Sequence, residues 1–116
     1  MLAIVDLIGK PFEQIKCWDL VREIYLRLGV DVGNYTEYDY SYTANMPNPW
    51  IPIVQPELYC LCLFSLAGKE IDHVGVYIGG GKMIHATVTS GVCAEDLSRY
   101  TRFARGMYKY GGELHD

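Results

Sequence analysis

Residues 73–87, HVGVYIGGGKMIHAT, carry the clearest strand and turn pattern in the chain. Two runs rich in β-branched and other large apolar residues flank three consecutive glycines at positions 79–81. Such runs are typical of strands, and glycine readily adopts the positive φ angles that tight hairpin turns require. The stretch therefore predicts a β-hairpin whose strands cover residues 73–78 and 82–87.

The register of this hairpin decides whether its two histidines can meet. If residues 79–81 form a three-residue loop, His85 lies opposite Gly75. His73 then points to the same face, about 7–8 Å from His85 by backbone and within reach through the rings, with Gly75 leaving space between them. A two-residue loop would place His85 on the opposite face. Two histidines on one face indicate a site, although structural histidines also pair.

A helix is predicted before the hairpin, because apolar residues recur at helical spacing between residues 17 and 28. The stripe consists of Cys17, Leu20, Val21, Ile24 and Leu28. Gly29 ends this helix. A shorter helix is predicted over residues 1–8, with Leu2, Val5 and Ile8 on one side and Gly9 as its stop.

Further strands are predicted over residues 58–66, 92–94 and 106–110, with a short helical turn at 95–100. Residues 31–57 contain four prolines and are predicted to be irregular. The tyrosines of this segment and Trp50 could roof a groove, but burial over the core is the favoured interpretation. Helices followed by an antiparallel sheet predict the α+β class.

Composition limits the range of functions. The chain has 116 residues, which predicts one domain over residues 1–116, and half of them are hydrophobic. A net charge of −4 without a basic run argues against nucleic acid as a partner. No apolar run approaches the ~20 residues of a membrane span. Residues 1–8 make a poor signal peptide, so synthesis in the cytoplasm is expected.

Four cysteines are present, and free thiols are expected in a reducing compartment. Cys60, Cys62 and Cys93 are predicted to be small core residues. His115, near the end of the sequence, is predicted to be solvated.

Cys17 is the candidate nucleophile. A thiol attacks a carbonyl as thiolate, which the start of a helix favours by ~0.3–1 kcal/mol and a proton-accepting histidine favours more strongly. His73 would be the base, His85 would orient it, and backbone N–H groups at the helix start would hold the oxyanion. The same three residues could instead bind zinc, but no carboxylate or second cysteine completes an obvious ligand motif.

Four segments together resemble the NlpC-type cell-wall cysteine peptidases, a papain-like group: IGKPF at 8–12, CWDLV at 17–21, HVGVYIG at 73–79 and KMIHA at 82–86. The resemblance implies a small papain-like α+β fold with Cys17, His73 and His85 as the catalytic residues. It implies no cofactor. The implied substrate is the peptidoglycan stem peptide, commonly cleaved between D-glutamate and a diamino acid.

Residues 16–19, Lys-Cys-Trp-Asp, replace the Asp-Cys-Ser-Gly common in that family and look more like its phage and prophage tail-associated members. The family's Trp-Gly-Gly before the cysteine is missing, and Phe12 could occupy the neighbourhood of its substrate-site tyrosine. Two alternatives remain: an acyltransferase or deamidase of a protein partner, and a decayed tail or effector component. Delivery to the wall is expected through a phage particle, lysis or a secretion system.

Overall fold

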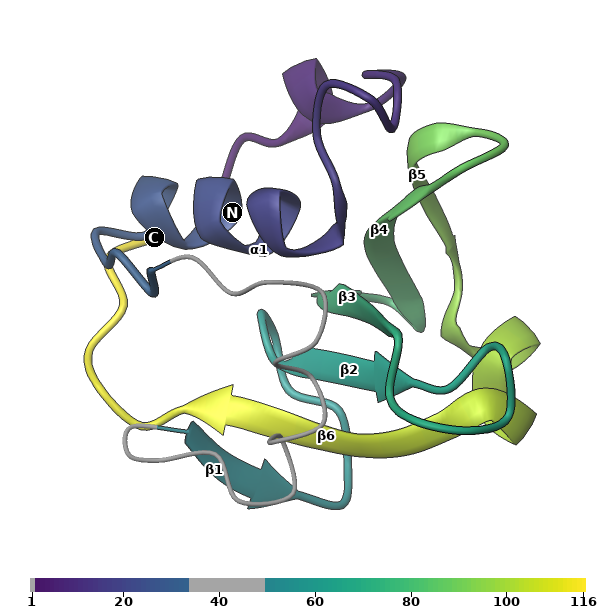
Figure 1. The fold of residues 1–116 in the computed structure, drawn as a ribbon. Helices are drawn as coiled ribbons and strands as arrows, with labels where there is room; N and C mark the ends of the chain where they lie inside the picture. The colour runs from purple at the N-terminus through teal and green to yellow at the C-terminus, as the bar shows by residue number, and fades with distance from the viewer. Residues whose placement is uncertain (1, 34–49) are drawn as a thin grey trace.

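The chain folds into a six-stranded antiparallel sheet with one long helix against it, seen in the computed structural model of Figure 1. The structure describes residues 2–33 and 50–116. Its elements are η1 (Val5–Leu7), α1 (Cys17–Arg27), β1 (Trp50–Ile53), β2 (Leu61–Phe64), β3 (His73–Gly79), β4 (Lys82–Thr87), β5 (Gly91–Asp96), η3 (Leu97–Phe103) and β6 (Ala104–Tyr110). The strand order is β1-β6-β2-β3-β4-β5, which confirms the predicted α+β class.

Helix α1 forms where the apolar spacing predicts it. Leu20, Val21, Ile24 and Leu28 are all buried, and Gly29 follows the helix at a φ of +87°. At the other end the Lys16 backbone N–H donates to the Asp19 carboxylate at 3.1 Å, which satisfies one N–H group at the helix start. Trp18 and Tyr25 are buried as well, so the apolar face is wider than the predicted stripe.

The β3–β4 hairpin has the predicted register but a different loop. Val76 pairs with Ile84, as a three-residue loop requires, yet Gly79 pairs with Lys82. The loop therefore contains only Gly80 and Gly81, and the register shifts by one residue between Tyr77 and Gly79. This irregularity, a β-bulge, compensates for the shorter loop and keeps both histidines on one face.

Strand β1 corrects the expectation of irregular structure throughout residues 31–57. Trp50–Ile53 pairs with β6 at the edge of the sheet, where Pro52 is tolerated because an edge strand needs fewer donors. Trp50 is buried and meets the rings of Tyr25 and Tyr110 edge-on, each at 5.5 Å between centroids. Trp50 thus covers the core, while the tyrosines at 35–42 lie outside the described residues.

Three further boundaries differ from prediction. The N-terminal helix is only the 3₁₀ turn Val5–Leu7, and Leu7 is its buried residue, whereas Val5 is 82% exposed. The strand predicted over 58–66 is shorter, Leu61–Phe64, because Tyr59 adopts a φ of +70° in the preceding turn. Glu95 continues strand β5, so the helical turn begins later, at Leu97.

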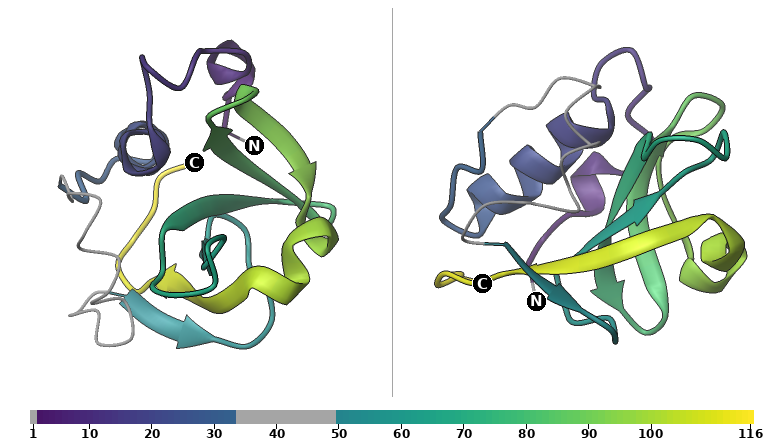
Figure 2. Two further views of the ribbon diagram at one scale, coloured as in Figure 1. Left: turned by 45° about the vertical axis from the view of Figure 1, so that its right-hand side comes forward. Right: turned by 60° about the horizontal axis from the view of Figure 1, so that its bottom comes forward.

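The sheet separates two apolar layers, and Figure 2 shows α1 and η3 in different parts of the molecule. Alternate residues of β2, β3 and β4 pack with α1: Leu61, Leu63, Val74, Val76, Ile84 and Ala86. The intervening residues form a second cluster with Tyr100 and Phe103 of η3: Cys60, Cys62, Phe64 and Met83. By this alternation His73 and His85 belong to the η3 side of the sheet.

The segment before α1 is fixed to the far edge of the sheet. The Gly9 N–H donates to the Val92 carbonyl at 2.8 Å, and the Val92 N–H donates to the Lys10 carbonyl at 2.9 Å. These bonds bring residues 10–12 beside the start of α1.

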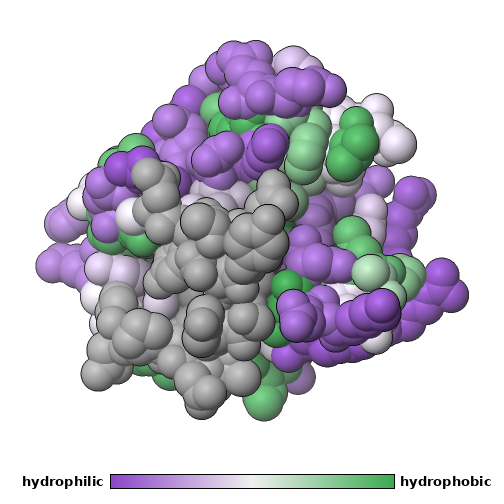
Figure 3. All heavy atoms as spheres, viewed as in Figure 1, coloured by the Kyte–Doolittle hydropathy of each residue, from purple (hydrophilic) through white to green (hydrophobic). Residues whose placement is uncertain are grey.

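None of the described helices combines the length and the apolar character needed to cross a bilayer. Outside the grey atoms, the face in Figure 3 is largely hydrophilic, with small separate hydrophobic patches.

Candidate active site

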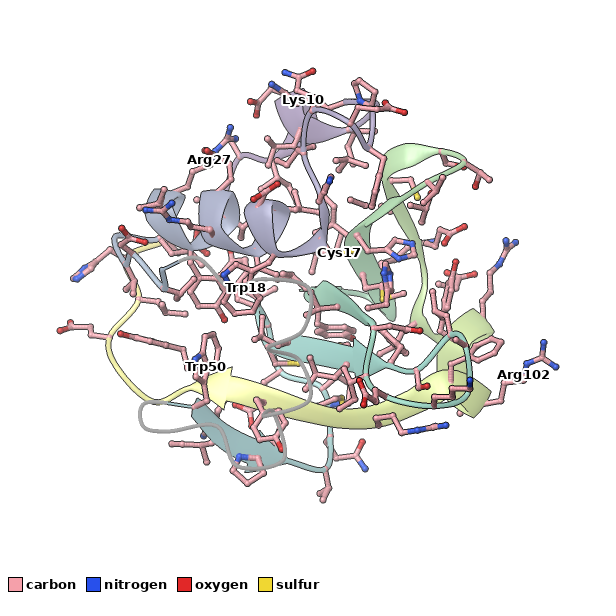
Figure 4. The ribbon with its side chains drawn as sticks, viewed as in Figure 1. Lys10, Cys17, Trp18, Arg27, Trp50 and Arg102 are labelled. Atoms are coloured by element: carbon pink, nitrogen blue, oxygen red, sulfur yellow. The ribbon has the colours of Figure 1, made fainter. Side chains whose placement is uncertain are left out.

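Cys17 lies where α1 begins, at the end of the helix nearest β4 (Figure 4). Its Sγ is 3.2 Å from Nδ1 of His73 and 3.5 Å from the carbonyl oxygen of Ala86. Cys17 is the first residue of its helix and His73 the first of its strand. The contact thus forms at element ends, where the helix layer and the η3 side of the sheet come together.

His73 and His85 form the pair that the hairpin register predicts. Nε2 of His73 lies 2.7 Å from Nδ1 of His85, and the two rings meet edge-on with 5.0 Å between centroids. Both side chains are buried. The structure therefore brings all three predicted residues, Cys17, His73 and His85, into one hydrogen-bonded row.

The row continues to two residues that the sequence analysis missed. Nε2 of His85 lies 2.7 Å from Oε2 of Glu95, and the Tyr100 hydroxyl donates to the same oxygen at 2.6 Å. Glu95 reaches His85 because Cys93 pairs with His85, and a residue two positions further along β5 points to the same face. The strand predicted over residues 92–94 ends before Glu95, and Glu95 was expected in the helical turn at 95–100, so a correct end for β5 is the signal that would have revealed it.

Burial keeps the histidines in their neutral form. Burial and the neighbouring His85 lower the pKa of His73 to about 4, against the opposing charges of Asp72 and Glu95. Burial also lowers the pKa of His85, although its hydrogen bond to Glu95 works in the other direction. At neutral pH, His73 is therefore free of a second proton and able to accept one from a thiol.

A pocket of about 360 Å³ opens beside the thiol of Cys17. Phe12 forms part of its wall, together with Leu66, Asp72 and the β4–β5 turn at 87–89. The wall is mainly apolar, and both carboxylate oxygens of Asp72 accept backbone N–H groups of the adjacent turn. Cys17 lines the same pocket, so a ligand bound there would lie next to the thiol.

Cys60, Cys62 and His115 lie away from this row of contacts, whereas Cys93 lies next to it. Cys60 and Cys62 are buried, as predicted, and His115 is exposed. Cys93 was expected in the core but is only half-buried, because it lies on strand β5 at the edge of the sheet.

A carboxylate and a second cysteine lie beside His85 in the structure, although no obvious sequence motif indicates them. Within residues 2–33 and 50–116, the ligand-type atoms of His85, Cys93 and Glu95 all lie within 4.8 Å of one another. Two of the three already share the 2.7 Å hydrogen bond between Nε2 of His85 and the Glu95 carboxylate. This group differs from the alternative zinc set, which contained Cys17 and His73.

Comparison with known proteins identifies the family and the fold. Residues 7–109 match the NlpC/P60 family. A search of curated proteins found no significant match. Two similar solved structures are an NlpC/P60 family protein from Bacillus cereus ATCC 10987 and the NlpC/p60 domain of the peptidoglycan hydrolase SagA.

Both structures give a TM-score of 0.65, at 20% and 21% identity respectively. The first alignment covers 84% of this chain but 32% of the Bacillus cereus protein, so the chain spans about a third of it. The second alignment covers 90% of both chains. The chain therefore belongs to the NlpC/P60 family and has the papain-like fold of its domains.

Proposed function

We propose that this protein is a cysteine peptidase or amidase that hydrolyses peptidoglycan stem peptides. The observation that carries the proposal is the 3.2 Å contact between Sγ of Cys17 and Nδ1 of His73, with His85 directly behind it. The similar domain of SagA belongs to a peptidoglycan hydrolase, which supports the choice of substrate. The finer proposal, taken from the family resemblance, is cleavage between D-glutamate and a diamino acid.

The first half of the reaction would acylate Cys17. His73 accepts the thiol proton at Nδ1, and the thiolate attacks the carbonyl carbon of the scissile amide. The negative charge that develops on the carbonyl oxygen is favoured near the N-terminus of α1. The C–N bond then breaks as His73 gives its proton to the leaving amine, and a thioester remains.

The second half would regenerate the thiol. A water molecule attacks the thioester carbonyl while His73 Nδ1 removes one of its protons. The carbon–sulfur bond breaks, the carboxylic acid product leaves, and His73 returns the proton to Cys17. Neutral His73 is needed at the start of each half, which the burial of its ring favours.

The test of this proposal is cleavage of purified muropeptides by the intact chain. Cys17→Ala and His73→Ala should abolish turnover, since each removes a group that forms or breaks a bond. Cys60→Ala is the control, because Cys60 is also a free thiol but lies in the second apolar cluster, which includes none of Cys17, His73, His85 and Glu95. Its turnover should stay close to that of the unchanged protein.

Two results would contradict the proposal. Unchanged muropeptide cleavage by Cys17→Ala would remove the nucleophile from the mechanism. Failure of the unchanged protein to cleave any muropeptide, together with release of ammonia from a protein amide in a parallel screen, would favour the deamidase alternative. Circular dichroism of each variant verifies that the fold is retained.

A further inference from the structure

We propose that Glu95, held by Tyr100, is a positioning residue that fixes the direction of the hydrogen bonds in the row, so that Cys17 donates to His73, His73 to His85 and His85 to Glu95. This inference rests on the proposed function for its kinetic consequence, but its structural consequence is measurable without any substrate. It concerns the two residues at the far end of the hydrogen-bonded row.

Glu95 contacts the histidine pair through its hydrogen bond to His85. His85 is fully buried, and the 2.7 Å hydrogen bonds of its ring go to His73 at one nitrogen and to Glu95 at the other. Tyr100 holds the same carboxylate oxygen at 2.6 Å and places its ring edge-on to His85, 5.1 Å between centroids. Glu95 is thus anchored from η3 as well as from its own strand.

The order of donors follows from the charge of Glu95. The hydrogen bond from Tyr100 and the contact with His85 lower the pKa of Glu95, so its carboxylate is ionised at neutral pH and only accepts. Nε2 of His85 must therefore carry the hydrogen, which leaves Nδ1 of the neutral ring as an acceptor. His73 then donates from Nε2.

This order leaves Nδ1 of His73 as the acceptor that faces the thiol of Cys17. The opposite order would put a hydrogen on that nitrogen and prevent it from taking the thiol proton. A neutral amide at position 95 permits both orders, because it can donate as well as accept. Glu95 therefore selects the productive tautomer of a histidine that it does not touch.

The same carboxylate also stabilises the positive charge that His73 gains during the reaction. Its negative charge opposes the effect of burial on the pKa of both histidines. Among the described residues, the other titratable groups around the row are Cys17 on α1, Asp72 before β3, Cys93 on β5 and Arg99 on η3. Asp72 favours the protonated His73 from the opposite side, whereas Arg99 acts on Glu95 itself.

The decisive variant is Glu95→Gln, which keeps the shape and removes the charge. Asp96→Asn is the matched control, because its carboxylate lies on the same strand, points to the other face and pairs with Lys82 at 2.7 Å. We expect kcat on muropeptides to fall about tenfold in Glu95→Gln with KM unchanged, less than the roughly 10²–10⁴-fold contribution of general acid–base catalysis as a whole. Asp96→Asn should change neither constant.

Nitrogen-15 NMR of the histidine rings is the substrate-free measurement. In the unchanged protein both buried rings should be Nε2–H tautomers, and in Glu95→Gln they should become mixtures and titrate at lower pH. Tyr100→Phe should shift them in the same direction by a smaller amount. A purely structural Glu95 would leave tautomers and titration midpoints as they are, and that result would overturn the proposal.

The two measurements separate this inference from the proposed function. If the unchanged protein cleaves no muropeptide but Glu95→Gln alters the tautomers, the positioning role stands and the substrate is wrong. If the protein cleaves muropeptides and Glu95→Gln keeps full kcat and both tautomers, the substrate stands and the positioning role is wrong.

Discussion

His85 has both ring nitrogens engaged inside the protein, and its side chain is inaccessible to solvent. It therefore cannot touch a substrate, and its effect on a reaction must pass through His73. A group of this kind acts by keeping its neighbour in the right orientation and tautomer, so its removal affects the transition state more than the ground state.

We expect His85→Ala to lower kcat on muropeptides by roughly 10²–10⁴-fold, the range of general acid–base catalysis, with little change in KM. His85→Asn should recover part of the rate, because its amide oxygen can accept the hydrogen bond from His73. Steady-state kinetics of both variants provide the measurement. A rise in KM at constant kcat would instead assign His85 to substrate binding.

The hairpin of β3 and β4 places the two histidines, and Gly75 is the residue that leaves room between these strands. A Cβ at position 75 would lie 2.8 Å from Sδ of Met83 and 3.4 Å from Cβ of His85. The first distance is too short for real atoms, but the thioether end of Met83 is flexible. The second, to the Cβ of His85, is an ordinary van der Waals distance, so the crowding comes from Met83, which packs next to His85 on the same strand.

Gly75→Ala is accordingly expected to destabilise the fold by about 1–3 kcal/mol, the usual range for overpacking, and to reduce muropeptide cleavage. Urea unfolding and kinetics measure the two effects. The double variant Gly75→Ala/Met83→Ala removes the closer clash, so activity should partly return although the core loses a side chain. No recovery would show that the clash with Met83 is not what limits the site.

Local patterns explain which elements the sequence could predict. The apolar spacing of α1 and the glycines after β3 are properties of short segments, and both elements appear with Cys17 and the histidines where expected. The predicted register of the β3–β4 hairpin is correct although the predicted loop is one residue too long, because a β-bulge compensates for the difference. Periodicity and turn residues act within a few positions of the chain, so they can be recognised in the sequence without knowledge of tertiary contacts.

Two features depend on pairing with distant residues and were not predictable in this way. Strand β1 is a strand because it pairs with β6, about 57 positions later along the chain, and because Trp50 finds Tyr25 and Tyr110. Glu95 joins the site because β5 continues past Cys93, which no periodicity in so short a strand reveals. Such contacts are tertiary, and they override local propensity.

Across the whole molecule, the hydrogen-bonded row connects layers that the sheet otherwise separates. It begins at α1 with Cys17, passes through β3, β4 and β5, and ends at Tyr100 of η3. Elements on both sides of the sheet therefore have to be in place before the row is complete. Lowering the pH is therefore expected to protonate the buried histidines of the row and to reduce the stability of the entire fold at the same time.

The sign of that dependence follows from His73. Its pKa is about 4 in the folded chain and ordinarily 6.5, so between these values the unfolded chain binds more protons than the folded one. The free energy of unfolding must then fall as the pH falls through this window. A shift of one unit corresponds to about 1.4 kcal/mol, so His73 alone accounts for up to about 3 kcal/mol.

We expect urea unfolding to show this loss between pH 6.5 and pH 4, with His85 adding to it in the same direction because burial lowers its pKa too. His73→Gln should flatten the dependence, since it removes the group whose protonation differs between the two states. His115→Gln, at an exposed histidine outside the row, is the matched control. If His73→Gln loses stability with the same slope as the unchanged protein, the buried histidine is not the group that couples folding to pH.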